Sequence, residues 1–330
     1  MKKILILLTG GTIASVQTPH GLEPLLRAEQ LLEYIPDMGK EIQLQLLEVC
    51  SLDSTNMDSS IWLKIAAQIE ENYNAYDGFV VCHGTDTMAY TAAALSYLIQ
   101  NSPKPIVLTG AQKPIQVEIT DAKRNLTDSI QYAADSGSSG VSVVFDGRVI
   151  AGTRAKKTKS FSYHAFSSIN FPELASMQRG EIVRFIPGTE TGPVRFYHHL
   201  DPGVFALKLT PGIRWEVLDN VLAHYPCLIL ESFGVGGVPD SIANDLCKLM
   251  ERHCNDRLLV MTTQVTYEGS DLSIYEVGRR IQERFPFLEA YDMNFEAVFT
   301  KLMWILGQKP TSFAEIRSLF YQKINYDVLL

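Results

Sequence analysis

The sequence predicts an α/β protein with a larger N-terminal domain, built on a mostly parallel sheet, and a smaller C-terminal α/β domain. Apolar strand-like runs alternate with helix-like segments along most of the chain, which favours parallel sheets. Two of the runs, residues 4–8 and 79–82, are rich in Ile, Leu and Val and end at glycine-containing turns, as buried parallel strands do. A length of 330 residues fits two domains.

The apolar runs and the periodic segments place the individual elements. Strands are expected at residues 4–8, 44–49, 79–82, 106–108, 141–145, 204–209, 227–231 and 258–261. Helices are expected at residues 28–34, 59–73, 87–100, 120–134, 213–223, 241–252, 275–283, 294–306 and 311–323. Ser59 or Ser60 could cap the second of these helices.

The alternation is interrupted between about residues 156 and 205, where turn residues are frequent. This stretch indicates a short β-rich segment followed by a linker. We therefore expect an N-terminal domain over residues 1–190, a linker over residues 191–210 and a C-terminal domain over residues 211–330.

Charge and hydropathy exclude several classes of protein. The net charge of -8 argues against general binding to nucleic acid or to an anionic membrane. No stretch approaches the roughly 20 apolar residues that a membrane span needs. The apolar run before Thr9 has five residues, which is shorter than the roughly 7–15 residues of a signal-peptide core. We expect a cytoplasmic protein whose mature N-terminus begins directly with the first strand.

The cysteines and histidines show no pattern of a disulfide framework or a metal site. Five cysteines, an odd count with wide spacing and no Cys-x-x-Cys pair, fit reduced thiols in a cytosolic protein. Cys82 and Cys227 lie inside apolar strand runs and are expected in the core. The seven histidines show no metal-ligand spacing, so we expect no metal.

Two threonine-glycine segments, residues 9–15 and 83–88, carry the chemistry. Both follow predicted strands, and open α/β sheets bind their ligands at the carboxyl ends of the strands. The segments hold several hydroxyls and one carboxylate, Asp86, a set suited to acyl transfer with a threonine as nucleophile. From the residues alone, a structural role remains open, since Thr12, Thr85 and Asp86 could also be ordinary helix caps.

These two segments, Thr-Gly-Gly-Thr-Ile-Ala and His-Gly-Thr-Asp-Thr-Met, resemble the paired signatures of the bacterial-type L-asparaginase/glutaminase family. The resemblance extends to residues 53–57, 109–112, 125–126, 152–157, 211–212 and 232–237. It implies an L-asparagine amidohydrolase, closer to the cytosolic type I branch, with a larger N-terminal and a smaller C-terminal domain. It implies no organic cofactor, and a homodimer or a dimer of dimers in which a neighbour's C-terminal domain contributes to each site.

The same resemblance implies a role for each site residue. Thr12 is the expected nucleophile, Thr85 activates water or assists proton transfer, and Asp86 pairs with the substrate α-ammonium. Lys157 is the expected partner of Thr85, and could accept its proton only if burial disfavoured the ammonium form. Lys156 stays open as an alternative. Residues expected to line the substrate are Gly11, Ser54, Thr55, Asp86 and Gln112, with Ser54 at the α-carboxylate.

The sequence departs from the family pattern at two positions. Leu22 stands where many members have a tyrosine that accepts the nucleophile's proton. Either another group assists Thr12, with His20 and Tyr163 as candidates on residue type alone, or Thr85 and Lys157 carry more of the work. Glu231 stands where asparagine-regulated members have an arginine, so we expect no allosteric response to asparagine.

Other functions remain as alternatives. A glutaminase-leaning enzyme differs from an asparaginase by one methylene in the substrate, which pockets discriminate modestly. The ammonia-releasing subunit of a tRNA-dependent amidotransferase carries an extra N-terminal domain, which is not expected here. A non-catalytic amino-acid sensor on the same fold would fit only if Leu22 marks lost catalysis. A dinucleotide site is not expected, because residues 10–14 lack the Gly-x-Gly-x-x-Gly spacing.

Overall fold

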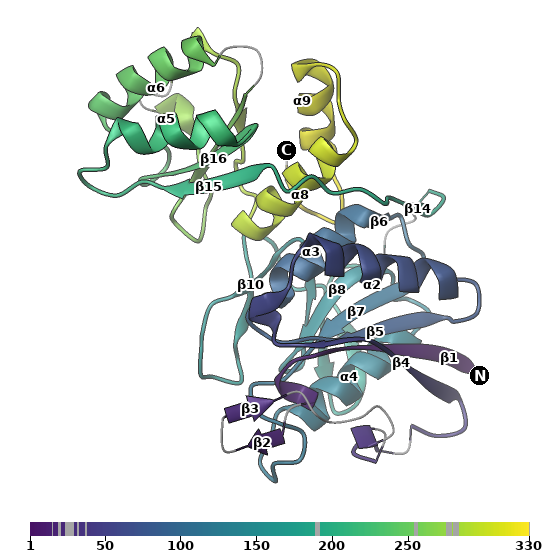
Figure 1. Ribbon diagram of the computed structural model, residues 1–330. Helices are drawn as coiled ribbons and strands as arrows, with labels where there is room; N and C mark the ends of the chain where they lie inside the picture. Colours follow the sequence, from purple (N-terminus) through teal and green to yellow (C-terminus); the bar gives the residue numbers. More distant parts are fainter. Residues whose placement is uncertain are drawn as a thin grey trace. The chain divides into compact units, whose positions relative to one another are not determined.

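The structure, a computed structural model, describes residues 1–14, 16–18, 21–23, 30–31, 33–36, 38–188, 192–253, 257–274, 279 and 284–329. Two compact units form the chain (Figure 1). The first unit comprises residues 1–198 together with 324–326, and the second comprises residues 199–323 together with 327–330. Residues 199–210, expected in a linker, thus lie in the second unit, and the short stretch 324–326 belongs to the first.

The first unit is organised around a sheet of eight strands in the order β13-β12-β9-β8-β7-β5-β1-β4. The strands are β1 (Lys2–Gly10), β4 (Ile42–Leu52), β5 (Gly78–Cys82), β7 (Pro105–Thr109), β8 (Gly140–Phe145), β9 (Arg148–Ala151), β12 (Ala175–Gln178) and β13 (Glu181–Arg184). From β4 through β8 every neighbouring pair is parallel, whereas β8, β9, β12 and β13 pair antiparallel. The prediction of a mostly parallel sheet is confirmed.

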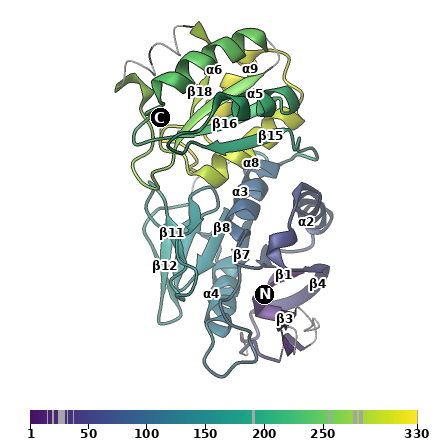
Figure 2. The same cartoon turned by 60° about the vertical axis from the view of Figure 1, so that its left-hand side comes forward.

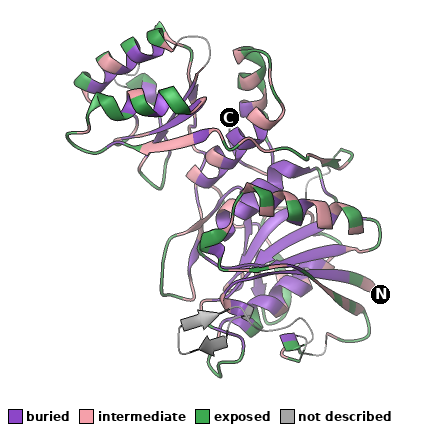
Figure 3. Cartoon of the chain, viewed as in Figure 1, coloured by how far each residue is buried: buried purple, intermediate pink, exposed green. Residues whose placement is uncertain are grey.

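Helices cover both faces of this sheet. Helices α2 (Ser59–Asn72) and α3 (Met88–Leu98) lie on one face, and α4 (Ala122–Ala134) lies on the other (Figure 1). Strands β5 and β7 are buried along their whole length, because helices cover them on both sides (Figure 3). Helix α4 packs its apolar residues Leu126 and Ile130 against Val80 and Val107 of the sheet.

Short elements complete the first unit. They are the 3-10 helices η1 (Thr12–Ala14) and η2 (Ser54–Asn56), and the strand pairs β2 (Val16–Thr18) with β3 (Gly21–Glu23), β10 (Ala155–Lys157) with β11 (Phe166–Ser168), and β6 (Ile99–Gln100) with β14 (Arg195–Phe196). The expected β-rich character of the stretch after residue 155 is therefore confirmed.

Two local predictions were wrong. The N-cap of α2 is Asp58, whose carboxylate accepts hydrogen bonds from the backbone N–H groups of Ser60 and Ile61, so neither Ser59 nor Ser60 is the cap. The helix expected to continue to residue 100 ends at Leu98, because Ile99 and Gln100 pair as a strand with residues almost a hundred positions later. The predicted helix 275–283 falls almost entirely outside the described residues, and residues 28, 29 and 32 of the predicted helix 28–34 also lie outside them.

The second unit has a parallel sheet of four strands in the order β15-β16-β17-β18. They are β15 (Val204–Lys208), β16 (Cys227–Ser232), β17 (Leu258–Thr263) and β18 (Leu288–Glu289), with a 3-10 helix η3 (Leu272–Ile274). Helices α5 (Trp215–His224) and α6 (Asp240–Arg252) share a core with one face of this sheet, and α8 (Phe295–Gly307) lies on the other face (Figure 2). Helix α9 (Phe313–Tyr321) packs against α8.

The burial of the cysteines and the length of the helices bear on two of the expectations from the sequence. Cys82 and Cys227 are buried in the strand cores, as predicted, and the four described cysteines, which also include Cys50 and Cys247, are free thiols. Cys254 lies outside the described residues. None of the helices within the described ranges is both long enough and apolar enough to cross a membrane.

Candidate active site

The two threonine-glycine turns emerge side by side from the first sheet. Strands β1 and β5 are parallel neighbours, and Leu8 lies opposite Cys82 just before the two turns. A Cβ atom on Gly11 would lie 2.4 Å from the backbone nitrogen of Gly84, so only glycine permits this approach of one backbone to the other. Gly11 also has a φ of 77°, in the left-handed region. The glycines therefore allow the turns of the two motifs to pack in direct contact.

Thr12 is held between contacts on both sides. The N–H of Gly11 donates to the carbonyl of Leu52 at 3.0 Å, and the carbonyl of Ile13 accepts from the N–H of Ile115 at 3.3 Å. Ile13 is buried, whereas Thr12 is only partly buried at the start of η1. The backbone of Thr12 is thereby fixed at the carboxyl edge of the sheet, with its side chain partly accessible to solvent.

A lysine, a hydroxyl and a carboxylate meet at the second turn. Lys157 Nζ donates to Thr85 Oγ1 at 2.8 Å and to Asp86 Oδ1 at 2.6 Å. Thr85 is 5% exposed, while the side chain of Asp86 is 57% exposed and that of Lys157 is 17% exposed. Lys157 ends strand β10, and successive strand residues point to opposite faces, so Lys156 is directed away from this cluster.

The polar residues at the start of α3 do not serve as its caps. Thr87 occupies the N-cap position without a side-chain capping bond, and its hydroxyl donates to the carbonyl of Ser54 at 2.7 Å. Thr85 donates to Gln112 Oε1 at 3.2 Å, and Asp86 accepts from Lys157. The three side chains are thus used between turns, which disfavours the ordinary capping role left open by the sequence.

His83 supports the turn from inside the protein. It is fully buried, its Nδ1 lies 2.7 Å from the carbonyl of Gly84, and its Nε2 lies 2.9 Å from Thr91 Oγ1. Because Trp62 Nε1 donates to that hydroxyl, Thr91 can donate to His83 Nε2, which leaves the His83 proton on Nδ1 facing Gly84. Burial lowers the pKa of His83 to about 4, so the ring is neutral at pH 7.

The loop after β4 contributes Ser54 and Thr55. Ser54 is 3% exposed, and a Cβ atom on Gly84 would lie 2.6 Å from its Oγ, so this hydroxyl faces the second turn. Thr55 is exposed, and both its N–H and its hydroxyl donate to Asp53 Oδ1 at 2.8 Å. Ser54 therefore joins the cluster directly, whereas the Thr55 hydroxyl is turned toward Asp53.

Gln112 reaches the cluster from the turn after β7. Its Oε1 accepts from Thr85, and its Nε2 donates to the backbone carbonyls of Ser160 and Ser162 at 3.2 and 3.1 Å. These two carbonyls belong to the loop between β10 and β11, which directly follows Lys157. Sequence reasoning missed them, since backbone carbonyls leave no signature in a residue pattern.

Tyr163 is the candidate for the proton acceptor of Thr12 that lies within the described residues. His20 lies outside the described residues, and Leu22 lies in β3, where only the backbone is described. Tyr163 donates its hydroxyl to the carbonyl of Ile119 at 3.2 Å, and Lys113 Nζ lies 5.6 Å from the centre of its ring.

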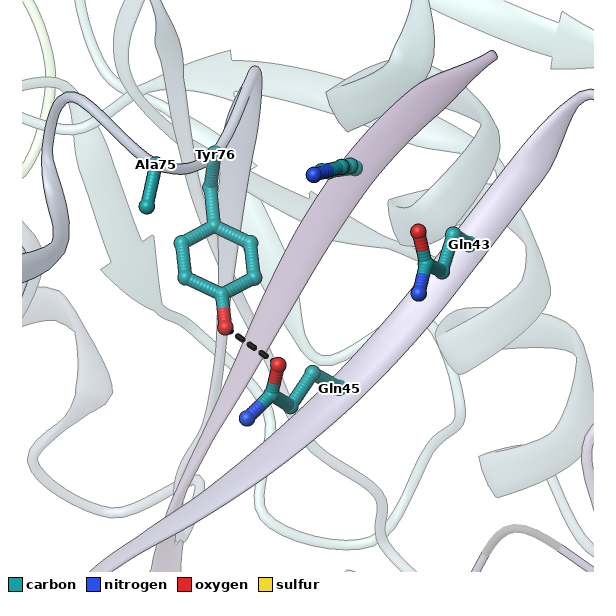
Figure 4. A pocket seen from close by; sticks show the side chains of 5 residues that line it. Gln43, Gln45, Ala75 and Tyr76 are labelled. Atoms are coloured by element: carbon teal, nitrogen blue, oxygen red, sulfur yellow. Dashed lines mark hydrogen bonds between the residues drawn. The ribbon is translucent and has the colours of Figure 1, made fainter.

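A cluster of metal ligands or a surface pocket would also mark a candidate site. No group of three or more His, Cys, Asp or Glu side chains in the described part of the chain is arranged to hold a metal ion. A pocket is lined by Lys3, Gln43, Gln45, Ala75 and Tyr76 (Figure 4). It lies near the amino ends of β1 and β4, whereas the motif residues lie at the carboxyl ends, and it therefore belongs to a different edge of the sheet.

The fold and this constellation define a two-unit α/β protein with hydroxyl, lysine and carboxylate side chains at the carboxyl edge of its larger sheet. Family models match both units: the model described as asparaginase, N-terminal, matches residues 3–187, and the glutaminase/asparaginase C-terminal domain matches residues 203–320. The chain belongs to the asparaginase family.

Curated relatives span nearly the whole chain. An L-asparaginase of Thermococcus kodakarensis is 39% identical over 324 residues, which cover 98% of each chain. L-asparaginase 1 of Escherichia coli is 32% identical, covering 93% of each chain. A glutamyl-tRNA(Gln) amidotransferase subunit of Methanosphaera stadtmanae is 32% identical, covering 93% of this chain and 72% of that protein.

Solved structures agree with the sequence relatives. The thermostable L-asparaginase from Thermococcus kodakarensis superposes with a TM-score of 0.92 at 37% identity, covering 99% of both chains. L-asparaginase I from Vibrio cholerae superposes with a TM-score of 0.88 at 30% identity, covering 100% of this chain and 99% of that one. The two-domain α/β fold and the family predicted from the motifs are confirmed.

Proposed function

We propose that this protein hydrolyses the side-chain amide of L-asparagine to L-aspartate and ammonia. The observation that carries the proposal is the contact of Lys157 Nζ with both Thr85 Oγ1 and Asp86 Oδ1, on a turn packed against Gly11. Membership of the asparaginase family and the relatives that bear the name L-asparaginase support the same activity.

Thr12 is the nucleophile in this proposal. Its Oγ attacks the amide carbon of the substrate, the carbon–nitrogen bond breaks, and the proton lost by Thr12 ends on the departing ammonia. Water then attacks the acyl ester on Thr12 and regenerates the hydroxyl, releasing aspartate. Backbone N–H groups near Gly84 and Thr85 stabilise the negative charge that develops on the amide oxygen.

The remaining residues bind and orient the substrate. Asp86 has an exposed carboxylate at the edge of the sheet and pairs with the α-ammonium group. Ser54 binds the α-carboxylate, with Gly11 and Thr55 bordering it. Thr85 and Lys157 position and deprotonate the water of the second step. No metal or organic cofactor takes part in this proposal.

The ammonium group of the substrate competes with Lys157 for Asp86. In the structure Lys157 is the cation that Asp86 binds, at 2.6 Å. Arrival of a second cation at this carboxylate weakens its hold on Lys157 and leaves the lysine to Thr85. Substrates that lack the α-ammonium should therefore react slowly as well as bind weakly.

The experiment that tests the proposal is ammonia release from L-asparagine and from L-glutamine by the wild type and by Thr12→Ala. We expect release from asparagine in the wild type and a loss of at least about 1,000-fold in the variant, as for removal of other nucleophiles. Thr127→Ala is the control, because that hydroxyl only bonds to Lys123 within α4. No ammonia from either amide would refute the enzyme and favour an amino-acid sensor.

A preference for glutamine is the second candidate. It is supported by the 32% identity to a protein that belongs to a glutamyl-tRNA(Gln) amidotransferase. The ratio of kcat/KM for the two amides decides between the candidates, and one methylene accounts for about 10- to 200-fold. If kcat/KM were higher for glutamine than for asparagine, glutamine would be the preferred substrate.

We also propose that the protein is a cytoplasmic homodimer or a dimer of dimers. The free thiols of the described cysteines fit a reducing compartment, and the resemblance to the family supports the assembly. Light scattering on the purified protein gives the mass directly. A monomer that is fully active would exclude a site that needs a neighbouring protomer.

A further inference from the structure

The amide of Gln112 has one possible orientation. Both of its Nε2 contacts, at 3.2 and 3.1 Å, are to the backbone carbonyls of Ser160 and Ser162, which can only accept hydrogen bonds. The NH₂ group must therefore face these carbonyls, and the amide oxygen must face Thr85. Since an amide NH₂ has two hydrogens, both are used within the protein.

This orientation determines the direction of the Thr85 hydroxyl. Before substrate binds, Lys157 is the cation held by Asp86, and an ammonium group can only donate, so Thr85 Oγ1 accepts from Lys157 Nζ at 2.8 Å. The single hydroxyl proton of Thr85 then goes to Gln112 Oε1, at 3.2 Å. One lone pair of Thr85 remains for a further donor, which makes the hydroxyl an acceptor toward any water or substrate that approaches it.

The backbone of Gln112 is fixed as firmly as its side chain. Asp121 is 7% exposed, and its carboxylate accepts from the N–H of Gln112 at 2.8 Å and from the N–H of Lys113 at 3.1 Å. Asp121 is the N-cap residue of α4 but makes no side-chain capping bond, because its carboxylate reaches back to this loop. The buried Asn125 donates to the carbonyl of Gly110 at 3.0 Å and steadies the same loop.

We infer that Gln112 is a positioning residue, which sets the Thr85 hydroxyl as an acceptor and joins it to the loop that follows Lys157. The inference deepens the proposed function and rests on it for the kinetic readout. Gln112 acts through Thr85, so its loss changes the rate of the chemical step more than the affinity for substrate.

The kinetic test uses Gln112→Leu, which keeps the approximate volume and removes both hydrogen-bonding ends. We expect kcat for asparagine to fall about 10- to 100-fold with KM changed less than about 3-fold. The control is Gln116→Leu in the same loop, which is exposed and should leave both constants unchanged. A rise in KM with unchanged kcat would overturn the inference, since Gln112 would then be a simple substrate contact.

The pH dependence of kcat in Gln112→Glu is a second test, because a purely structural role of Gln112 would not change it. The ionised carboxylate cannot donate to Ser160 and Ser162, whereas the protonated acid can donate one hydrogen and still accept from Thr85. We expect the ratio of the variant's kcat to that of the wild type to rise as the pH falls from about 7 to about 5, toward the range in which glutamic acid titrates. A ratio independent of pH would count against the inference.

A structural measurement separates this inference from the proposed activity. In crystals of Gln112→Leu we expect the Thr85 hydroxyl to rotate away from its wild-type position beside Lys157. If the wild type released no ammonia, the proposed function would fail, but this rotation would still be observable. An unchanged Thr85 and Lys157 geometry in the variant would overturn the inference whether or not the enzyme is active.

Discussion

Both sheets contain neighbouring parallel strands, but the carboxyl ends of these strands use their polar side chains differently. In the second unit, Ser232 at the end of β16 is fully buried and donates to the carbonyl of Thr262 at 2.7 Å. At the end of β17, Thr263 donates to the carbonyl of Gly234 at 2.5 Å and accepts from the N–H of Val265. These two hydroxyls therefore bond to backbone groups and link neighbouring backbone segments.

At the edge of the first sheet, by contrast, the partners are side chains, and two residues of this cluster, Lys157 and Asp86, are ionisable. Thr85 lies between Lys157 and Gln112, and Asp86 is largely exposed. The difference shows that the carboxyl end of a parallel strand offers a place for a site, while chemistry needs an ionisable partner there. The edge of the second sheet satisfies its own turns, and the edge of the first leaves side-chain hydrogen-bonding capacity for a ligand.

Removing the charge of Lys157 should abolish this difference between the two sheet edges. We expect this substitution to have the largest effect. Lys157→Met keeps the length of the side chain without its charge, and kcat for asparagine should fall about 100- to 10,000-fold, the usual contribution of a proton-transfer group. The fold should be little affected, since an ion pair with the exposed Asp86 contributes less than about 1 kcal/mol.

Lys156→Met is the matched control for that variant, because Lys156 is the preceding residue of the same strand and faces the other way. Steady-state kinetics and denaturant unfolding of both variants measure the two effects. If Lys156→Met lost the activity and Lys157→Met kept it, the alternative left open by the sequence would be correct and the contact described above would be irrelevant.

The sequence was sufficient for the parts of this site that depend on local motifs. The glycine turns after β1 and β5 were predicted from residue types, because buried parallel strands and close backbone approach both restrict the sequence. The choice of Lys157 over Lys156 came from the register of a motif. Its contact with Thr85, 72 positions away, could not be derived from hydropathy.

The parts that could not be predicted depend on backbone groups and on distant pairing. The carbonyls of Ser160 and Ser162 exist at every residue, so nothing marks the two that bind Gln112. Gln100 was expected in a helix, but a strand partner at Arg195 overrides its local preference. Asp58 was overlooked as a cap because two serines follow it and have similar capping preference.

The buried His83, which supports the turn of the candidate site, should make stability depend on pH. His83 has a pKa of about 4 because burial disfavours its charge, against 6.5 in the unfolded chain. The unfolded state therefore binds the proton first as the pH falls, so this residue's contribution to stability is complete above about pH 6.5 and is lost toward pH 4. The difference between the two values corresponds to about 3 kcal/mol.

His83→Gln should remove that dependence, although it lowers stability at every pH. The measurement is the free energy of unfolding by denaturant between pH 4 and pH 7.5 in wild type and variant. Asp128 acts in the opposite direction in this range, since burial raises its pKa to about 6, so only the difference between the two proteins isolates His83. His224→Gln, exposed in the second unit, is the control and should leave the slope unchanged. A variant that retains the wild-type slope would show that the pKa of His83 is the same in the folded and the unfolded protein.

The smallest expected effect falls on the edge of the second sheet, where we predict a loss of stability without a loss of chemistry. Ser232→Ala removes a buried hydroxyl that donates to Thr262, which should lower the free energy of unfolding by about 1–2 kcal/mol. Ser241→Ala, on the exposed start of α6, should change it by less than about 0.5 kcal/mol.

The kinetics of Ser232→Ala decide whether the comparison holds. Because its hydroxyl bonds to a backbone carbonyl and is closed to solvent, kcat and KM for asparagine should stay within about 2-fold of the wild type under conditions where the variant is folded. A fall in kcat of more than about 10-fold, with unfolding unchanged, would mean that Ser232 takes part in the reaction. Burial against a backbone carbonyl would then no longer distinguish a structural hydroxyl from a catalytic one.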